Sequence, residues 1–229
     1  CHYMQLYLVR HAESQNNARP ENERVEDPPI TDVGHQQANC LAEWLRSLKI
    51  HTLICSPVRR ALQTTRYVVK STGSHVHVWA DVFEEGGIYS GYGPSAIAGG
   101  KGLSRADVID HVADSAEHCT LDESIVDDGW WGERNRETPE QAHHRAGGVK
   151  RRLIDTFGAD ATTVVAIIHA DFKRRMLSHL LGDSIESIGL GHLRNTGVTK
   201  LDYDGHDWTL DWFNSISHLP NDLITGGGG

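Results

Sequence analysis

The sequence of 229 residues predicts an α/β fold: a three-layer sandwich with a mostly parallel central sheet flanked by helices. The first observation is that short β-rich apolar segments alternate with segments of helical periodicity, the pattern of a helix-covered parallel sheet. The second is that Thr162–Ile168 is continuously apolar and β-branched, which is typical of a strand buried on both faces. The third is the composition, 38% hydrophobic with 23 glycines, which is that of a globular chain.

Capping signals set the expected helix starts. Thr31 precedes an apolar pattern at helical spacing, and Ser56 followed by Pro57 combines a capping residue with a first-turn proline. Thr138–Gln141 has the form of a capping box. The expected elements in chain order are a strand at Tyr3–Val9, a helix at Asp32–Leu48, a strand at Thr52–Cys55, a helix from Ser56 to Lys70, a strand at Val76–Ala80, a helix from Thr138 to Phe157, a strand at Thr162–Ile168, a helix at Ala170–Leu181, and late strands at Val198–Tyr203 and Trp208–Trp212.

A glycine-rich segment at about residues 86–137 interrupts this alternation. Long excursions of this kind are more often lids or binding loops than simple connectors, so we expect an inserted, lid-like loop region. Two interpretations of Trp130 and Trp131 stay open: they line the lid over a leaving group, or they fix the loop to the body. We expect one domain over residues 1–225, with this insertion, and a flexible tail at Gly226–Gly229.

Charge and cysteine usage exclude several classes of protein. The formal net charge is −9, whereas nonspecific nucleic-acid binders carry a basic face or tail. No run of about 18 apolar residues is present, which predicts no membrane span. The four cysteines lie far apart without a C-x-x-C pair, which argues against a zinc ribbon or a disulfide framework and favours a reducing compartment. We therefore expect a cytoplasmic protein.

Histidines and arginines follow three of the predicted strands. Arg10 and His11 come after the first strand, Arg59 and Arg60 after the second, and His169 after the long apolar one. Taken singly, these are packing histidines or surface charges. Ligands of open α/β sheets, however, bind outside the carboxyl ends of the strands, so we expect these residues to converge. Such a cationic pocket, with one ionisable nucleophile, suits a phosphoryl group.

The residues around these positions carry a resemblance to a known family. Leu8–Ser14 (LVRHAES) resembles the signature of the histidine phosphatase superfamily, which has the phosphoglycerate-mutase-like fold. The likeness covers most of residues 4–203. The further segments that agree in order and spacing are Pro29–Ala38, Ser56–Thr64, Val82–Gly87 and Val165–Ala170.

The resemblance implies roles for individual residues. His11 is similar to the nucleophile that becomes phosphohistidine. Arg10, Arg60 and His169 are similar to the residues that hold the transferring phosphoryl group, and Asn17 is an additional ligand. The neighbouring arginines and a charged His169 would disfavour the imidazolium form of His11, as nucleophilic attack requires.

The resemblance also implies the acid and the reaction. Glu84 is similar to the general acid; Glu85 offers a second carboxylate, and the choice of Glu84 rests on its place before the glycine pair. A carboxyl kept protonated by burial can give the leaving alkoxide its proton, and as a base it can then activate water against the phosphohistidine. The implied enzyme is a metal-independent histidine acid-type phosphatase, a phosphoric monoester hydrolase with a small phosphorylated substrate and no cofactor.

Two other functions remain as alternatives. A phosphoglycerate-mutase-type phosphotransferase would share the first half-reaction, but the sequence EEGGIY at Glu84–Tyr89 replaces the Asn-Glu-Arg run of the cofactor-dependent mutases. A catalytically silent scaffold that binds phospho-ligands would have lost one of the reactive residues, all of which are present. The sequence thus favours a hydrolase and leaves its substrate and oligomeric state open.

Overall fold

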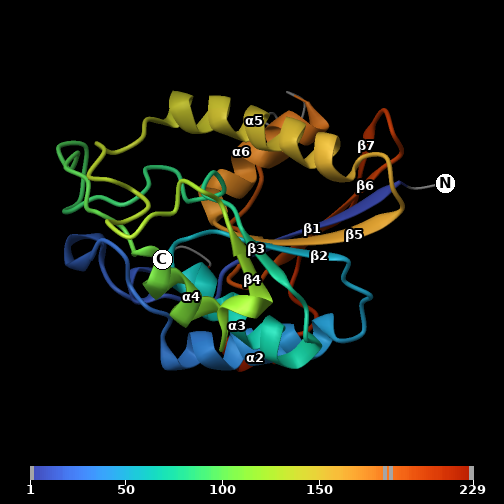
Figure 1. The fold of residues 1–229 in the computed structure, drawn as a ribbon, viewed down its shortest axis with the longest axis horizontal. Coiled ribbons are helices and arrows are strands. Elements are labelled where there is room, and N and C mark those ends of the chain that lie inside the picture. Colours follow the sequence, from blue (N-terminus) through green and yellow to red (C-terminus); the bar gives the residue numbers. More distant parts are fainter. Residues whose placement is uncertain (1–2, 183–184, 186–187, 227–229) are drawn as a thin grey trace.

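In the computed structural model, which describes residues 3–182, 185 and 188–226, a seven-stranded sheet forms the centre of the fold (Figure 1). The strand order across the sheet is β4-β3-β2-β5-β1-β6-β7. The bounds of the strands are β1 (Met4–Arg10), β2 (Thr52–Cys55), β3 (Val76–Val78), β4 (Cys119–Leu121), β5 (Thr162–Ile168), β6 (Val198–Tyr203) and β7 (Trp208–Ser215).

Five neighbouring strands of this sheet run parallel, and the last two strands are added by antiparallel pairing, first β6 to β1 and then β7 to β6. β5 pairs in parallel with both β1 and β2, and β2 continues in parallel to β3 and β4. β6 and β7 close the other edge as antiparallel strands. The mostly parallel sheet predicted from the sequence is confirmed, and its most apolar strand lies at its centre.

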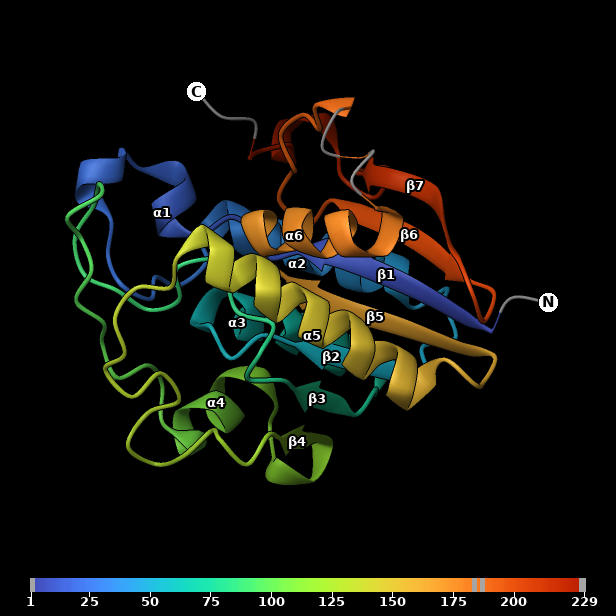
Figure 2. The same cartoon turned by 90° about the horizontal axis from the view of Figure 1, so that it is seen from above.

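Helices cover both faces of the sheet, as Figures 1 and 2 show from two directions. α2 and α3 pack on one face, with α4 against α3, and α5 and α6 pack on the other. No helix in the described ranges combines the length and the apolar character needed to cross a membrane. The helix bounds are α1 (Gln15–Ala18), α2 (Asp32–Leu45), α3 (Arg59–Thr72), α4 (Arg105–Val112), α5 (Pro139–Phe157) and α6 (Ala170–Leu181), with 3-10 turns at Glu21–Glu23, Ala116–His118 and Asn221–Leu223.

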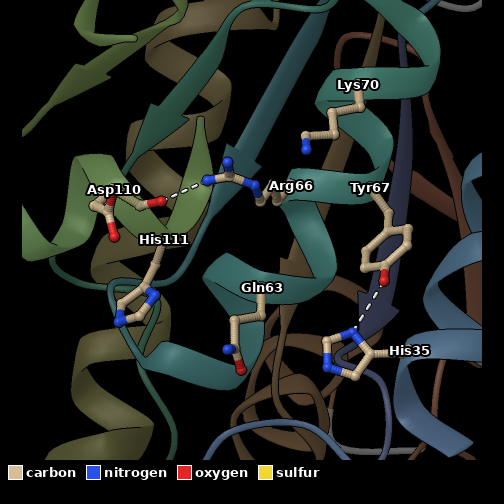
Figure 3. A pocket seen from close by; sticks show the side chains of 7 residues that line it. All are labelled: His35, Gln63, Arg66, Tyr67, Lys70, Asp110 and His111. Atoms are coloured by element: carbon tan, nitrogen blue, oxygen red, sulfur yellow. Dashed lines mark hydrogen bonds between the residues drawn. The ribbon is translucent and has the colours of Figure 1, made fainter. Parts of the chain in front are cut away.

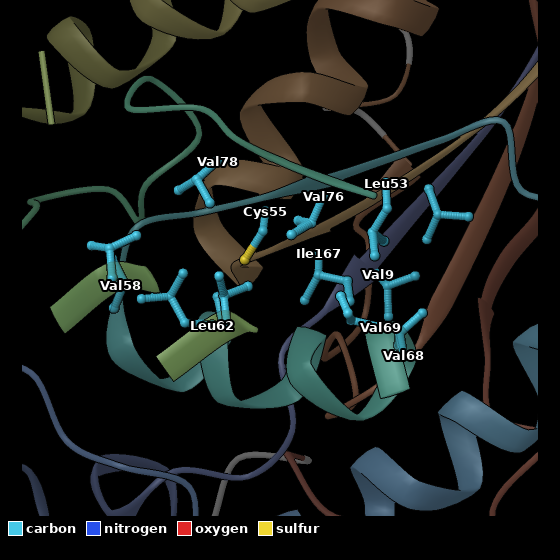
Figure 4. Packing of buried hydrophobic residues seen from close by; sticks show 14 of the residues in the cluster. Val9, Leu53, Cys55, Val58, Leu62, Val68, Val69, Val76, Val78 and Ile167 are labelled. Carbon is cyan, nitrogen blue, oxygen red and sulfur yellow. The ribbon is translucent and has the colours of Figure 1, made fainter. Parts of the chain in front are cut away.

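The alternation of side chains along each strand divides the core into two layers. Val9 and Ile167 pack toward α2 and α3, in the cluster drawn in Figure 4, whereas their neighbours Leu8 and Ile168 pack toward α5 and α6. Burying one such aliphatic side chain contributes about 1.5–3 kcal/mol. Because β1 and β5 are buried on both faces, they hold the polar residues at their carboxyl ends in fixed positions.

Several element boundaries differ from the sequence prediction by a few residues. The predicted helix start at Ser56 is wrong: α3 begins at Arg59, and the N-cap position is occupied by Val58. The Ser56 hydroxyl instead bonds the imidazole of His169, so it serves a buried partner and not a helix end. The first long helix ends at Leu45 and not Leu48, and the third strand ends at Val78 and not Ala80.

The segment at about residues 86–137 contains regular structure that the sequence analysis did not anticipate. Helix α4 lies within it, and β4 adds a parallel edge strand beside β3. Trp130 and Trp131 are buried against the ring of Phe83, with ring centroids 5.5 and 5.0 Å away, so they fix the segment to the core. Of the predicted flexible tail Gly226–Gly229, residues 227–229 lie outside the described residues.

A close backbone approach accounts for the glycine in the first turn of α2. A Cβ on Gly34 would lie 2.2 Å from the carbonyl oxygen of Glu13, in the loop that follows β1. That same oxygen accepts a hydrogen bond from the backbone N–H of Thr31, 2.9 Å away, so the loop cannot easily move aside. Gly148 in α5 has open space at the same position, with only the end of the Arg151 side chain at 3.9 Å.

We expect Gly34→Ala to lower the free energy of unfolding by about 1–3 kcal/mol, because the added methyl group overlaps a backbone oxygen. The matched control, Gly148→Ala, should raise it by about 0.4–1 kcal/mol, since alanine restricts the unfolded chain without a clash. Urea unfolding followed by circular dichroism measures both. Equal effects of the two substitutions would contradict the close approach at Gly34.

Candidate active site

A cavity of about 190 Å³ is lined by residues from the end of β1, from α1 and from the glycine-rich loops. Of the residues singled out in the sequence, Arg10, His11, Asn17, Arg60 and Glu84 line it. The full lining is Arg10, His11, Ser14, Asn16, Asn17, Arg24, Arg60, Glu84, Glu85, Gly87, Tyr89, Arg136 and Asp171. Residues far apart in the sequence therefore meet at one edge of the sheet, as the strand order predicts.

The His11 imidazole is held in one tautomer by two hydrogen bonds. Its Nδ1 lies 2.7 Å from the carbonyl oxygen of Ala12, which can only accept, so Nδ1 carries the ring proton. Its Nε2 lies 3.0 Å from Nε of Arg60, which can only donate. The network thus assigns the neutral ring with its lone pair on Nε2. That lone pair belongs to a side chain lining the cavity.

The surroundings of His11 also oppose a second proton. The ring is buried, and burial lowers its pKa well below the usual 6.5 because a charged imidazole would lose its hydration. The guanidinium groups of Arg60 and Arg10 lower the pKa further by charge repulsion. His11 is therefore uncharged at neutral pH.

Arg10 and Arg60 supply positive charge at the base of the cavity. Burial lowers the pKa of Arg10 to about 10, which still leaves it protonated at neutral pH. Its Nη1 donates to the carbonyl oxygen of Leu193, while its buried Nε has no hydrogen-bond partner among the described residues. A buried donor without a partner is costly, so this N–H marks a place where an anionic ligand would fit.

His169 stands beside His11 but does not line the cavity. The two ring centroids are 5.0 Å apart, and His169 is fully buried. Its Nε2 lies 2.8 Å from the Ser56 hydroxyl, and its Nδ1 has no partner in the part of the chain that the structure describes. Burial lowers its pKa well below 6.5, with Arg60 and His11 adding to the effect. The ring is therefore neutral, not the charged group that the sequence analysis assumed.

Asn17 is oriented by a residue that the sequence analysis missed. The Asn17 side-chain oxygen accepts from the backbone N–H of Ser14 at 3.1 Å and from the side-chain amide of Asn195 at 3.2 Å. Asn195 also donates to the carbonyl oxygen of His11 and is completely buried. It follows no strand and belongs to no periodic pattern, so no sequence signal could have identified it. With its oxygen occupied, Asn17 is left with amide donors.

The structure distinguishes the two neighbouring glutamates. Glu84 accepts hydrogen bonds from the backbone N–H groups of Glu85 and Phe172, both at 2.9 Å, the latter in the first turn of α6. Burial, and then the negative charge of Asp171, nevertheless raise its pKa to about 7. Glu85 instead forms an ion pair with Arg175 at 2.9 Å. Glu84 is thus the carboxyl group that exchanges a proton near neutral pH.

A partly buried arginine, Arg145, fixes the segment that carries this carboxyl. Arg145 of α5 forms a two-pronged ion pair with Glu137 and donates to the carbonyl oxygens of Asp81 and Phe83. Its guanidinium lies 3.5 Å from the ring centroid of Phe83 and 4.1 Å from that of Phe172. Phe83 directly precedes Glu84 in the chain, and the backbone N–H of Phe172 donates to the Glu84 carboxylate. Glu84 is therefore held by α5 through Arg145 and Phe83, and by α6 through Phe172.

A different hollow, of about 440 Å³, opens on the outer side of α3 (Figure 3). In this hollow, the Arg66 guanidinium donates to the carbonyl oxygen of Asp110 and forms an ion pair with Asp114. The hollow shares no lining residue with the cavity at His11. Its lining is His35, Gln63, Arg66, Tyr67, Lys70, Asp110 and His111. Among the described residues, no group of three or more His, Cys, Asp or Glu side chains is arranged to hold a metal ion.

A protein-family model matches most of the chain. The family model described as "Histidine phosphatase superfamily (branch 1)" matches residues 6–216. A "Probable phosphoglycerate mutase GpmB" of Enterobacter sp. is 40% identical over 73 residues, which are 32% of this chain and 34% of that protein. The chain therefore matches about a third of the length of that relative.

Solved structures share the fold across nearly the whole chain. A phosphoserine phosphatase mutant of Entamoeba histolytica in complex with phosphoserine superposes with a TM-score of 0.62 at 18% identity, covering 95% of this chain and 100% of that one. The native mycobacterial glucosyl-3-phosphoglycerate phosphatase gives a TM-score of 0.62 at 20% identity, covering 92% and 98%. At these identities the likeness establishes the fold.

Proposed function

Since the chain belongs to the histidine phosphatase superfamily, we propose that it is a phosphomonoester hydrolase that works through a phosphohistidine on His11. The observation that carries the proposal is the neutral imidazole whose Nε2 lone pair lies against the Arg60 guanidinium. A nucleophile held in one tautomer among cations is suited to attack an anionic phosphorus centre. Its substrate would be a small phosphorylated molecule.

In the first step, Nε2 of His11 forms a bond to phosphorus while the ester P–O bond breaks. The approaching phosphoryl oxygens take over the Arg60 hydrogen bond, and the unpaired Nε–H of Arg10 gains an acceptor. These cations stabilise the charge that spreads over the phosphoryl oxygens in a loose transition state. The protonated carboxyl of Glu84 gives its proton to the leaving alkoxide.

In the second step, water attacks the phosphohistidine. Glu84, now a carboxylate, removes a proton from the water as the P–N bond breaks and the electron pair returns to Nε2 of His11. Inorganic phosphate leaves, and Glu84 is protonated again for the next cycle. A pKa of about 7 allows this one group to act as both acid and base near neutral pH. The amide of Asn17, which lines the cavity, completes the phosphoryl site in this proposal, and the ring of His169 supports it from its place next to His11, outside the cavity lining.

The experiment that tests the proposal is the hydrolysis of an aryl phosphate in the presence of a chelator. We expect turnover to persist in the chelator and to vanish in His11→Ala, because the nucleophile is removed. The matched control, His35→Ala, removes an imidazole from the outer hollow and should retain full turnover. Rapid denaturation during turnover, followed by mass spectrometry of peptides, should find one phosphoryl group on His11.

Other outcomes of this experiment identify the alternatives. Absence of turnover in the wild type would contradict an enzyme and favour a binding scaffold. Conversion of 3-phosphoglycerate to its 2-phospho isomer without release of phosphate would favour a mutase.

The alkaline side of the pH profile provides a second test. We expect kcat/KM toward an alkyl phosphomonoester to fall as pH rises through about 7, because Glu84 loses the proton that the leaving group needs. Glu84→Gln should lower kcat/KM by about 10²–10⁴ and abolish that pH dependence. Glu85→Gln, which removes a charge already paired with Arg175, should keep the profile. The same alkaline decline in Glu84→Gln would rule out the proposed acid.

A further inference from the structure

Resting on this proposed function, we infer that the substrate carries a second oxyanion, a carboxylate or another phosphate, on its leaving group. The residues that would recognise it are Arg24 and Arg136. Both line the cavity at His11, yet neither is one of the two arginines placed at the reacting phosphoryl group. The mouth of the cavity therefore holds two guanidinium groups beyond those that the hydrolysis itself needs.

These two arginines are brought together by one aromatic ring. The guanidinium carbon of Arg24 lies 3.7 Å from the ring centroid of Tyr89, and that of Arg136 lies 4.2 Å from the same centroid. Nη1 of Arg24 also donates to the carbonyl oxygen of Tyr89 at 2.7 Å, and Nη1 of Arg136 donates to that of Gly93 at 3.0 Å. Stacking and carbonyl contacts fix both planes while leaving other N–H groups on each guanidinium for a ligand.

The charge of the pair is not balanced by a carboxylate in contact. Within the described residues neither Arg24 nor Arg136 forms an ion pair, whereas Glu85, which lines the same cavity, is already paired with Arg175. Burial lowers the pKa of Arg24, and the charges of Arg60 and Arg136 lower it further, while Tyr89 and Glu26 oppose the shift. Cations held close together in this way gain stability from an added anion.

The position of Arg136 assigns this anion to the leaving group. Arg136 and Glu85 line the cavity at His11 and also a larger hollow of about 510 Å³ beside it. With the phosphoryl group at His11, a leaving group that follows the shared lining would pass Arg136 toward this hollow. Because Glu21 and Glu137 also line the hollow, the second anion is expected at Arg136 and not farther out. A guanidinium there presents the planar fork that matches a carboxylate or a phosphate.

Calorimetric titration of the His11→Ala variant, which cannot turn substrate over, tests the inference through binding alone. The carboxylate arm compares 3-phosphoglycerate with glycerol 3-phosphate, and the phosphate arm compares fructose 1,6-bisphosphate with fructose 6-phosphate. Each pair differs in the second anion, so the contribution of the shared phosphoryl group cancels. We expect the doubly anionic member of at least one pair to bind about 10–100-fold more tightly, and the arm that shows it identifies the anion.

Added to this variant, Arg24→Met or Arg136→Met should each reduce the preference to about threefold or less, and Arg24→Lys should retain part of it. Arg134→Met is the matched control. Arg134 is two positions before Arg136 in the sequence and also stacks on an aromatic ring, that of Trp131, but it does not line the cavity. Equal binding within both pairs, or a preference that survives both methionine variants, would overturn the inference. A preference that persists although the wild type releases no phosphate would refute the hydrolase and support the anion site.

Discussion

The contact between Nε of Arg60 and Nε2 of His11 is the interaction on which the rest of the site depends. It can form because β1 and β2 both pair in parallel with β5, so that the chain leaves the sheet at the same edge after each strand. The donor meets the ring nitrogen at 3.0 Å while Ala12 holds the ring proton on the opposite nitrogen. The fold thus fixes the orientation of the His11 imidazole by placing one guanidinium beside it, which is the arrangement that the proposed nucleophile requires.

The surroundings of the cavity shift the pKa values of two titratable groups in opposite directions. Burial and the arginines lower the pKa of His11, whereas burial and Asp171 raise the pKa of Glu84. Burial disfavours the charged form of each group. The imidazole therefore does not take up a second proton, and the carboxyl keeps its proton to a higher pH than usual. Two groups whose pKa values are shifted in this way can provide an unprotonated nucleophile and a protonated acid at the same pH. Hydrolysis as proposed needs that combination, and the second anion site at Arg24 extends the positive field toward the leaving group.

The sequence predicted the parts of the site that depend on strand order and missed those that depend on loops. Arg10, His11 and Arg60 could be placed together because each follows a recognisable apolar strand, and parallel strands deliver their ends to one edge. Arg24 and Asn195 lie in irregular segments where no periodicity relates position to direction. Ser56 was placed at a helix start because a hydroxyl can cap a helix or bond a side chain, and only the fold decides between them.

The most direct test of the account is the protonation state of His11, measured by nitrogen-15 NMR of the imidazole as pH is varied. The ring should be neutral at neutral pH with its proton on Nδ1, and it should stay neutral to a pH well below 6.5, because burial and two guanidinium groups oppose the charge. A ring that titrates at or above 6.5, or one that carries its proton on Nε2, would contradict it.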